Sequence, residues 1–306
     1  MEHIIEVSGL KKSYGNIHAV KGIDFHVKTG QLFAFLGPNG AGKSTSVEML
    51  CTLLEPDGGT VLIDGYTLGK EDKEIRSSIG VVFQNNLLDE LLTVEENLKI
   101  RGSFYGLKGE ALDEAIRFAA ENTGAADILK RKYMNLSGGQ RRRADIARAL
   151  MHSPKILFLD EPTTGLDPQS RKSIWETIRT MQQNTNMTVF LTTHYMEEAA
   201  KADYVVTIVD GEISACGTPA ELREEYSKDT LYLHCKPEEE KNVSAFLEEK
   251  QIAFKQEGGN LIATLDSTMD ALPIVNELQE SLEGFEVVAG TMDDAFIAIT
   301  GKGLQK

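Results

Sequence analysis

One glycine-rich segment constrains the fold of this 306-residue chain more than any other feature. The segment reads Gly37-Pro38-Asn39-Gly40-Ala41-Gly42-Lys43-Ser44-Thr45, which matches the pattern G-x-x-x-x-G-K-[ST]. The compact apolar run Leu32–Leu36 precedes it, and Ser44–Leu54 follows it with apolar residues at helical spacing. The sequence therefore predicts a strand, a phosphate-binding loop and a helix in that order, within an α/β fold.

The residue types in this loop suit the binding of a nucleotide phosphate. Glycines let several backbone N–H groups converge on one anion, and a helix that begins near Gly42 adds its positive dipole end. Lys43 can reach the β- and γ-phosphates, and the Ser44 hydroxyl can be a ligand of Mg²⁺. A chance glycine turn is the alternative. The strand before the loop and the helix after it favour nucleotide binding.

A second candidate site lies after the apolar run Ile156–Leu159, where Asp160 and Glu161 stand. Further apolar runs, Thr188–Thr192 and Tyr204–Val209, alternate with helical segments, which predicts a mostly parallel sheet. Parallel strands present their carboxyl ends to the ligand. Asp160 could hold Mg²⁺ through water, and Glu161 could orient or deprotonate an attacking water. Solvated acids at a strand end are the alternative.

The segment Leu136-Ser137-Gly138-Gly139-Gln140 narrows the choice among nucleotide-binding folds. It matches the LSGGQ signature of ABC transporter ATPases letter for letter, and the chain resembles that family from about Ile4 to Pro219. Other family motifs follow in the family order. These are the A-loop aromatic (Tyr14), the Q-loop (Gln84), the D-loop (Gly165-Leu166-Asp167) and the switch histidine (His194).

The resemblance implies roles for these residues. Tyr14 would stack on adenine, and His194 would donate a hydrogen bond to the γ-phosphate. The implied catalytic residues are Glu161, His194, Gln84 and Lys43, and the implied metal ligands are Ser44, Gln84 and Asp160. The residues implied to bind ATP are Tyr14, Gly37, Pro38, Asn39, Gly40, Ala41, Gly42, Lys43, Ser44, Thr45, Gln84, Ser137, Gly138, Gly139, Gln140, Asp167 and His194.

The resemblance also implies an assembly. Ser137 and Gly139 would complete the site of a facing subunit, so that a head-to-tail homodimer encloses two ATP molecules with Mg²⁺, and Asp167 would lie at the seam. A separate transmembrane permease would be the second partner. We expect its cytoplasmic helix to dock near the apolar stretch Leu87–Leu92, although packing within the helical subdomain is an alternative use of that stretch. The expected location is the cytoplasmic face of the cell membrane.

Composition excludes some partners and compartments. The formal net charge is −15, which disfavours binding to nucleic acid. No run approaches about 18 consecutive apolar residues, so we expect any membrane pore to be supplied by another chain. The three cysteines are scattered and have no metal-ligand spacing, which indicates reduced thiols.

We predict two domains. Residues 1–220 would form the ATPase domain, a P-loop NTPase core with a helical subdomain at about 88–152, in which Ile4–Val7 is a short strand and Leu10–Gly15 a loop. Residues 221–306 carry 18 acidic and 8 basic side chains, and their pattern predicts a small α+β domain with a ferredoxin-like βαββαβ order.

The last residues of the chain bear on direction of transport. The element at 291–301 is similar to the closing "DDxFxxxTG" element of drug-resistance and antibiotic-type ABC-2 exporters. This likeness implies export of a drug-like, lipid, peptide or ion substrate. An importer ATPase, a soluble ABC ATPase that takes no part in transport and an ATP-binding regulator are the alternatives.

Overall fold

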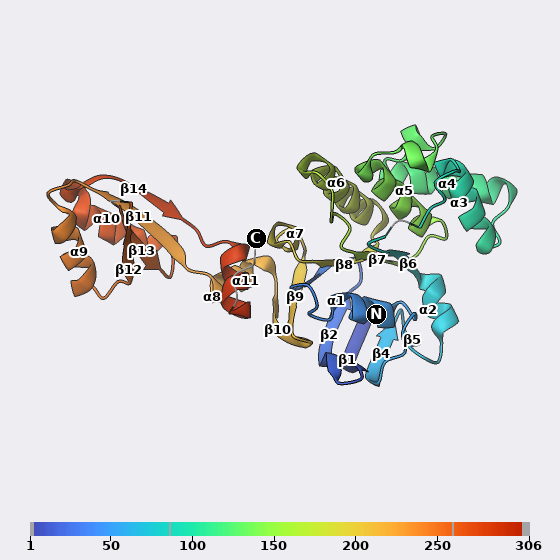
Figure 1. Cartoon of the computed structure of the whole chain (residues 1–306), viewed down its shortest axis with the longest axis horizontal. Helices are drawn as coiled ribbons and strands as arrows, with labels where there is room; N and C mark the ends of the chain where they lie inside the picture. Colours follow the sequence, from blue (N-terminus) through green and yellow to red (C-terminus); the bar gives the residue numbers. More distant parts are fainter. Residues whose placement is uncertain (1–2, 86, 259, 302–306) are drawn as a thin grey trace. The chain divides into compact units, whose positions relative to one another are not determined.

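The computed structural model describes residues 3–85, 87–258 and 260–301. The chain divides into two compact units, Met1–Cys216 and Gly217–Lys306. This division falls slightly before the predicted domain boundary at 220. Figure 1 shows the helices and strands of each unit.

A six-stranded sheet forms the centre of the first unit. Strands β3, β9, β8, β7 and β6 run parallel, as predicted. All side chains of β3 and β7 are buried, which explains their continuous apolar sequences. The order across the sheet is β10 (Glu212–Gly217), β9 (Tyr204–Val209), β3 (Leu32–Leu36), β8 (Thr188–Thr193), β7 (Ile156–Asp160) and β6 (Ile79–Val82).

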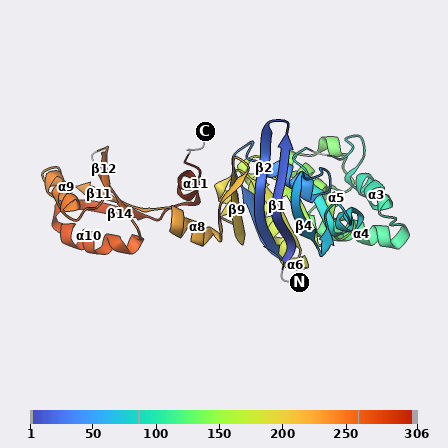
Figure 2. The same ribbon diagram turned by 90° about the horizontal axis from the view of Figure 1, so that it is seen from below.

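A second sheet has the order β2-β1-β4-β5, and its first three strands lie side by side in Figure 2. It comprises β1 (His3–Tyr14), β2 (Ile17–Lys28), β4 (Gly58–Ile63) and β5 (Tyr66–Thr67). The predicted loop at Leu10–Gly15 is wrong, because β1 continues to Tyr14. The strand is irregular near Gly9, which has φ of +59°, and its pairing with both neighbours shifts register there. Phe25 of β2 packs against Phe33 and Phe35 of the parallel sheet.

Helices cover the parallel sheet and build the helical subdomain. Around the sheet lie α1 (Lys43–Leu50), α2 (Asp72–Ser78), α6 (Pro168–Thr185) and α7 (Met196–Ala199). Helix α1 ends four residues before the predicted Leu54. The helical subdomain contains α3 (Val94–Phe104), α4 (Gly109–Thr123), α5 (Gly138–Leu150) and the short 3₁₀ turns Ala126–Ile128 and Tyr133–Asn135. Within the described part of the chain, no helix is both long and apolar enough to span a bilayer.

The second unit has the predicted βαββαβ order and an antiparallel sheet ordered β12-β13-β11-β14. Its first helix, α8 (Pro219–Tyr226), packs on its last, α11 (Met292–Thr300). The glycine pair Gly258-Gly259 also predicts a turn in this unit. Gly258 is in a turn, and Gly259 lies outside the described residues. The elements between α8 and α11 are β11 (Asp229–Cys235), α9 (Glu240–Glu249), β12 (Phe254–Glu257), β13 (Asn260–Leu265), 3₁₀ turn Thr268–Asp270, α10 (Ala271–Leu278), 3₁₀ turn Gln279–Ser281 and β14 (Leu282–Val288).

Candidate functional site

The glycine-rich loop wraps around the Lys43 ammonium between β3 and α1. Lys43 Nζ donates hydrogen bonds to Gly37 O at 2.8 Å and to Pro38 O at 3.1 Å, and the side chain is 4% exposed. Gly42 has φ of +106°, and a Cβ added there would lie 2.4 Å from Ala19 O, so only glycine fits. Burial lowers the pKa of Lys43, although the charge of Glu161 opposes this effect. The loop therefore holds a buried cation beside the start of a helix.

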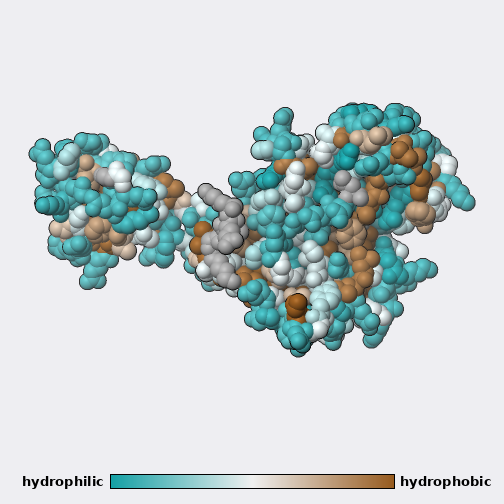
Figure 3. Space-filling model, viewed as in Figure 1, coloured by the Kyte–Doolittle hydropathy of each residue, from teal (hydrophilic) through white to brown (hydrophobic). Residues whose placement is uncertain are grey.

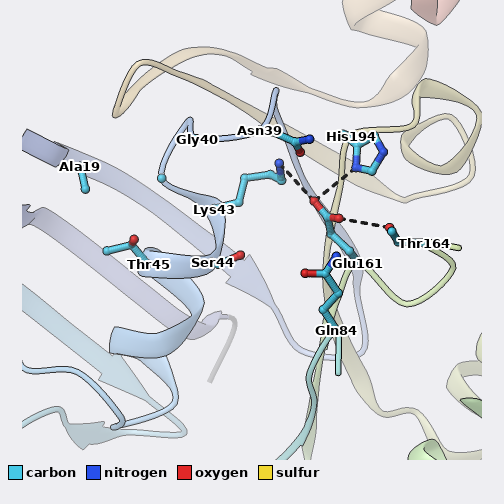
Figure 4. A pocket seen from close by; sticks show the side chains of 11 residues that line it. Ala19, Asn39, Gly40, Lys43, Ser44, Thr45, Gln84, Glu161, Thr164 and His194 are labelled. Atoms are coloured by element: carbon cyan, nitrogen blue, oxygen red, sulfur yellow. Dashed lines mark hydrogen bonds and ion pairs between the residues drawn. The ribbon is translucent and has the colours of Figure 1, made fainter. Parts of the chain in front are cut away.

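Glu161 lies at the centre of the polar groups in Figure 4. Its Oε1 is 3.4 Å from Lys43 Nζ and 3.2 Å from His194 Nδ1, and Thr164 Oγ1 donates to its Oε2 at 3.1 Å. Burial raises the pKa of this carboxyl, but the charges of Lys43 and His194 and hydrogen bonds from His194 and Thr164 lower it, and the pKa lies below its ordinary value. These contacts favour the ionised form of the carboxylate.

The backbone at Glu161 adopts an unusual conformation for a non-glycine residue, with φ of +45°. Thr192 at the end of β8 holds this turn: its Oγ1 accepts a hydrogen bond from Glu161 N at 3.0 Å and donates to Asp160 Oδ1 at 2.5 Å. Such strain is usual where a side chain must be presented to a ligand. Thr192 therefore fixes both acidic residues at the carboxyl end of β7, Asp160 and Glu161.

A cavity of about 470 Å³ joins these groups. Most of the residues predicted from the loop and the switch motifs line it, and two lining residues, Ala19 and Thr164, were not predicted. Gly37 and Asp160 are buried next to the cavity, in contact with Lys43 and Ser44 respectively. The residues that line the cavity are Ala19, Asn39, Gly40, Gly42, Lys43, Ser44, Thr45, Gln84, Glu161, Thr164 and His194.

The donor atoms next to Ser44 suit a magnesium ion. Ser44 Oγ donates to Asp160 Oδ1 at 3.4 Å, so a hydroxyl and a carboxylate oxygen converge there, and Gln84 lines the same cavity. Mg²⁺ prefers such oxygen ligands and usually takes only one or two from the protein beside substrate phosphates. Among the described residues, no group of three or more His, Cys, Asp or Glu side chains could cage a metal.

The Leu136–Gln140 segment and two other predicted elements do not line this cavity. Ser137 caps α5: Gln140 N donates to Ser137 Oγ at 3.4 Å, and Ser137 N donates to Gln140 Oε1 at 3.1 Å. Asp167 caps α6 through Ser170 N at 2.9 Å. Tyr14, at the β1–β2 turn, is 48% exposed. These groups are available for contacts outside the chain's own cavity.

Arg142 joins the α5 helix to Gln84. Its Nη1 donates to Phe83 O at 2.7 Å and its Nη2 to Gln84 O at 3.2 Å, and the side chain is buried. Arg142 could not be predicted as a functional residue, because it lies in a run of three arginines with no distinguishing pattern. The contact fixes the backbone from which the Gln84 side chain reaches the cavity.

Comparisons with known proteins agree with this geometry. A family model described as "ABC transporter" matches residues 20–164. The chain is 37% identical to the daunorubicin/doxorubicin resistance ATP-binding protein DrrA of Streptomyces peucetius over 97% of this chain and 92% of that protein. It is 43% identical to the linearmycin resistance ATP-binding protein LnrL of Bacillus subtilis over 74% of this chain and 73% of that protein. A dimeric structure of the ATP-binding cassette MJ0796, in a post-hydrolysis state bound to ADP and Pi, matches with a TM-score of 0.63 and 29% identity over 70% of this chain and 98% of that one.

Proposed function

Because this chain belongs to the family of ABC transporter ATP-binding subunits, which hydrolyse ATP, we propose that two copies hold two MgATP molecules head to tail and drive export through a separate membrane subunit. In this proposal, ATP closes the dimer and hydrolysis opens it again. The membrane subunit converts that motion into transport. A shared ligand that is destroyed by hydrolysis provides the switch between the two states.

One observation carries the proposal: the cavity and the Leu136–Gln140 segment are two separate anion-binding devices of one chain. The cavity presents Lys43 and a helix start, whereas Ser137 stands at the start of α5, outside the cavity. A head-to-tail pair would bring the second device of one copy to the cavity of the other. The cassette MJ0796 was solved as a dimer in a post-hydrolysis state that still holds ADP and Pi, which supports the pairing of two copies. In the proposed cycle the dimer opens once the cleaved phosphate has left.

Several residues in and next to the cavity have separate roles in the proposed hydrolysis. Lys43 binds the transferred phosphate, and Glu161 orients water and accepts its proton. His194, 3.2 Å from Glu161, is placed to donate to the γ-phosphate. Ser44, Gln84 and Asp160 would hold Mg²⁺, which supplies charge neutralisation when bound. Tyr14 would stack on adenine from the β1–β2 turn.

ATP-dependent dimerisation tests the proposal directly. We expect Glu161→Gln protein to sediment as a monomer without nucleotide and as a dimer with MgATP, because the γ-phosphate then persists between Lys43 and the partner's Ser137. ADP should leave it monomeric. Sedimentation equilibrium over a wide concentration range measures this. A protein that stays monomeric with ATP at every concentration would contradict the shared site.

Export is the direction that the relatives favour. Two of them are named as antibiotic-resistance ATP-binding proteins, and DrrA aligns with nearly the whole chain, including the second unit. We therefore place this chain at the cytoplasmic face of the membrane, where it would energise export of a drug-like, lipid, peptide or ion substrate. Uptake by inverted vesicles that contain the permease would support export. Transport only in the opposite direction would favour the importer alternative.

We also propose where the permease docks. Hydrophobic side chains gather on the face of the first unit near the helical subdomain in Figure 3. Leu87 and Leu91 follow the Gln84 segment and are 54% and 71% exposed, and Phe104 at the end of α3 is 74% exposed. Exposed apolar patches on a protein surface mark interaction sites. Leu87 and Leu91 follow the cavity residue Gln84 closely in the sequence, which supports coupling between permease docking here and ATP hydrolysis.

Leu91→Asp should uncouple the permease from ATP hydrolysis. We expect the isolated variant to keep its basal hydrolysis rate, since Leu91 does not line the cavity, and to lose at least about 10-fold in affinity for the permease, because a charge is placed against an apolar partner surface. Leu53→Asp is the matched control, because Leu53 is also exposed (61%) but lies outside residues 87–104. Pull-down and permease-stimulated hydrolysis measure both effects. Equal losses of permease affinity in Leu91→Asp and Leu53→Asp would argue against this surface as the docking site.

A further inference from the structure

A buried carboxylate lies next to the site without lining its cavity. Glu198 of α7 is 4% exposed, and its two carboxylate oxygens accept hydrogen bonds from two different hydroxyls. Thr163 Oγ1 donates to Oε1, and Thr193 Oγ1 donates to Oε2 at 2.6 Å. When both oxygens act as acceptors, the group has the hydrogen-bonding pattern of an ionised carboxylate. A buried charge is costly unless its hydrogen bonds are complete, so this placement calls for an explanation.

The two threonines belong to the two segments that carry Glu161 and His194. Thr163 follows Glu161 by two residues, and Thr193 directly precedes His194. Thr193 Oγ1 also accepts a hydrogen bond from Tyr195 N at 3.0 Å. The Glu198–Thr193 contact therefore fixes the backbone on both sides of His194, and the Glu198–Thr163 contact fixes the turn after Glu161.

We propose that Glu198 is a positioning residue for ATP hydrolysis, which sets the spacing between Glu161 and His194 through the hydroxyls of Thr163 and Thr193. The two functional side chains lie 3.2 Å apart, and they directly follow two different strands, β7 and β8. Backbone pairing of these strands ends at Asp160 and Thr192. Beyond that point Glu198 ties the two segments together. The inference rests on the roles proposed above for Glu161 and His194.

A charged acceptor suits this position better than an amide. Charge-assisted hydrogen bonds are shorter and stronger than neutral ones, and a carboxylate accepts from both threonines at once. Glutamine has the same shape but only one acceptor atom. Glu198→Gln should therefore preserve packing while it weakens one of the two hydrogen bonds from the threonines. Misplacement of catalytic groups by about 1 Å can lower the reaction rate about 100-fold.

The test compares Glu198→Gln with Glu197→Gln, its exposed neighbour on α7. We expect Glu198→Gln to lower kcat by about 10- to 100-fold with KM for ATP changed less than about threefold, because the phosphate-binding loop is untouched. Glu197→Gln should match the wild type in both constants. Thermal unfolding of each variant reports whether the fold is intact. A kcat of Glu198→Gln within twofold of the wild type would overturn the proposal.

A double-mutant cycle keeps the proposal falsifiable if Glu198→Gln is also less stable. Thr193→Val removes the hydroxyl, and Thr193→Ser keeps it. We expect Thr193→Val to lower kcat, Thr193→Ser to restore it, and Thr193→Val combined with Glu198→Gln to be little worse than the poorer single variant. If the losses of kcat from Thr193→Val and Glu198→Gln were fully additive, or if Thr193→Ser lost as much kcat as Thr193→Val, Glu198 would not position the catalytic groups through Thr193. The proposal would then be overturned. Glu161→Gln tests the proposed function separately. The proposed function and the positioning role of Glu198 can therefore be told apart if one of them fails.

Discussion

Glu161→Gln is expected to lower the rate of ATP hydrolysis by about 10²–10⁴-fold while ATP binding is retained. The amide cannot accept a proton from water, but it has the size of the carboxylate and can still accept the hydrogen bond from Thr164 Oγ1. Lys43 stays wrapped by Gly37 O and Pro38 O, so the phosphate-binding loop remains formed. The loss should therefore fall on kcat.

The measurement is phosphate release at saturating MgATP, together with ATP binding by equilibrium dialysis. Glu197→Gln is the matched control, because it removes the same charge from an exposed position. Wild-type turnover in Glu161→Gln would remove Glu161 from the role of base. Loss of ATP binding in the same variant would mean that its charge supports Lys43, whose pKa is lowered by burial and held up by Glu161.

Local patterns were enough to predict the elements that carry the phosphate site. The buried parallel strands β3, β7, β8 and β9 are continuous apolar runs, and their predicted ends agree with the structure to within one residue. The same holds for the helix start at Lys43, because the glycine-rich loop marks it. In the second unit the predicted order of elements is also confirmed, because apolar residues recur at strand spacing in the strands and at helical spacing in the helices.

The course of β1 could not be predicted from local pattern. Residues 10–14 are mostly polar, and they form a strand because β2 pairs with them and β4 pairs with Lys11. Strand propensity depends on such neighbours. The positions of Thr192, Arg142 and Glu198 also depend on tertiary structure: each is a single polar residue, and only the fold brings it to Asp160, Gln84 or the threonines.

The family motifs identified Ser137 and Asp167, but motif order says nothing about which cavity they serve. The structure places them away from the chain's own cavity, as caps of α5 and α6. A Cβ on Gly139 would lie 2.9 Å from Ser170 Oγ, so the segments that begin these two helices pack closely. The starts of α5 and α6 therefore lie side by side, as the proposed head-to-tail dimer requires.

Two inactive variants should restore each other's activity when they are mixed. Lys43→Met removes the cation of the phosphate-binding loop. Ser137→Asp keeps a good helix N-cap but places a negative charge where the partner's γ-phosphate would lie. We expect each variant alone to hydrolyse ATP at less than about 1% of the wild-type rate, because every shared site of its homodimer then contains one damaged half.

In a mixed dimer the two defects fall in the same site, since the damaged loop of one copy faces the damaged Ser137 of the other. The second site then combines an intact Lys43 with an intact Ser137. About half of the dimers in an equimolar mixture are mixed, and each has one working site of two, so the mixture should recover about a quarter of the wild-type rate. Ser137→Asn is the control for the cap, because it caps the helix without the charge. If the mixture is no more active than its parts while both variants remain folded and the wild type dimerises, the head-to-tail arrangement is wrong.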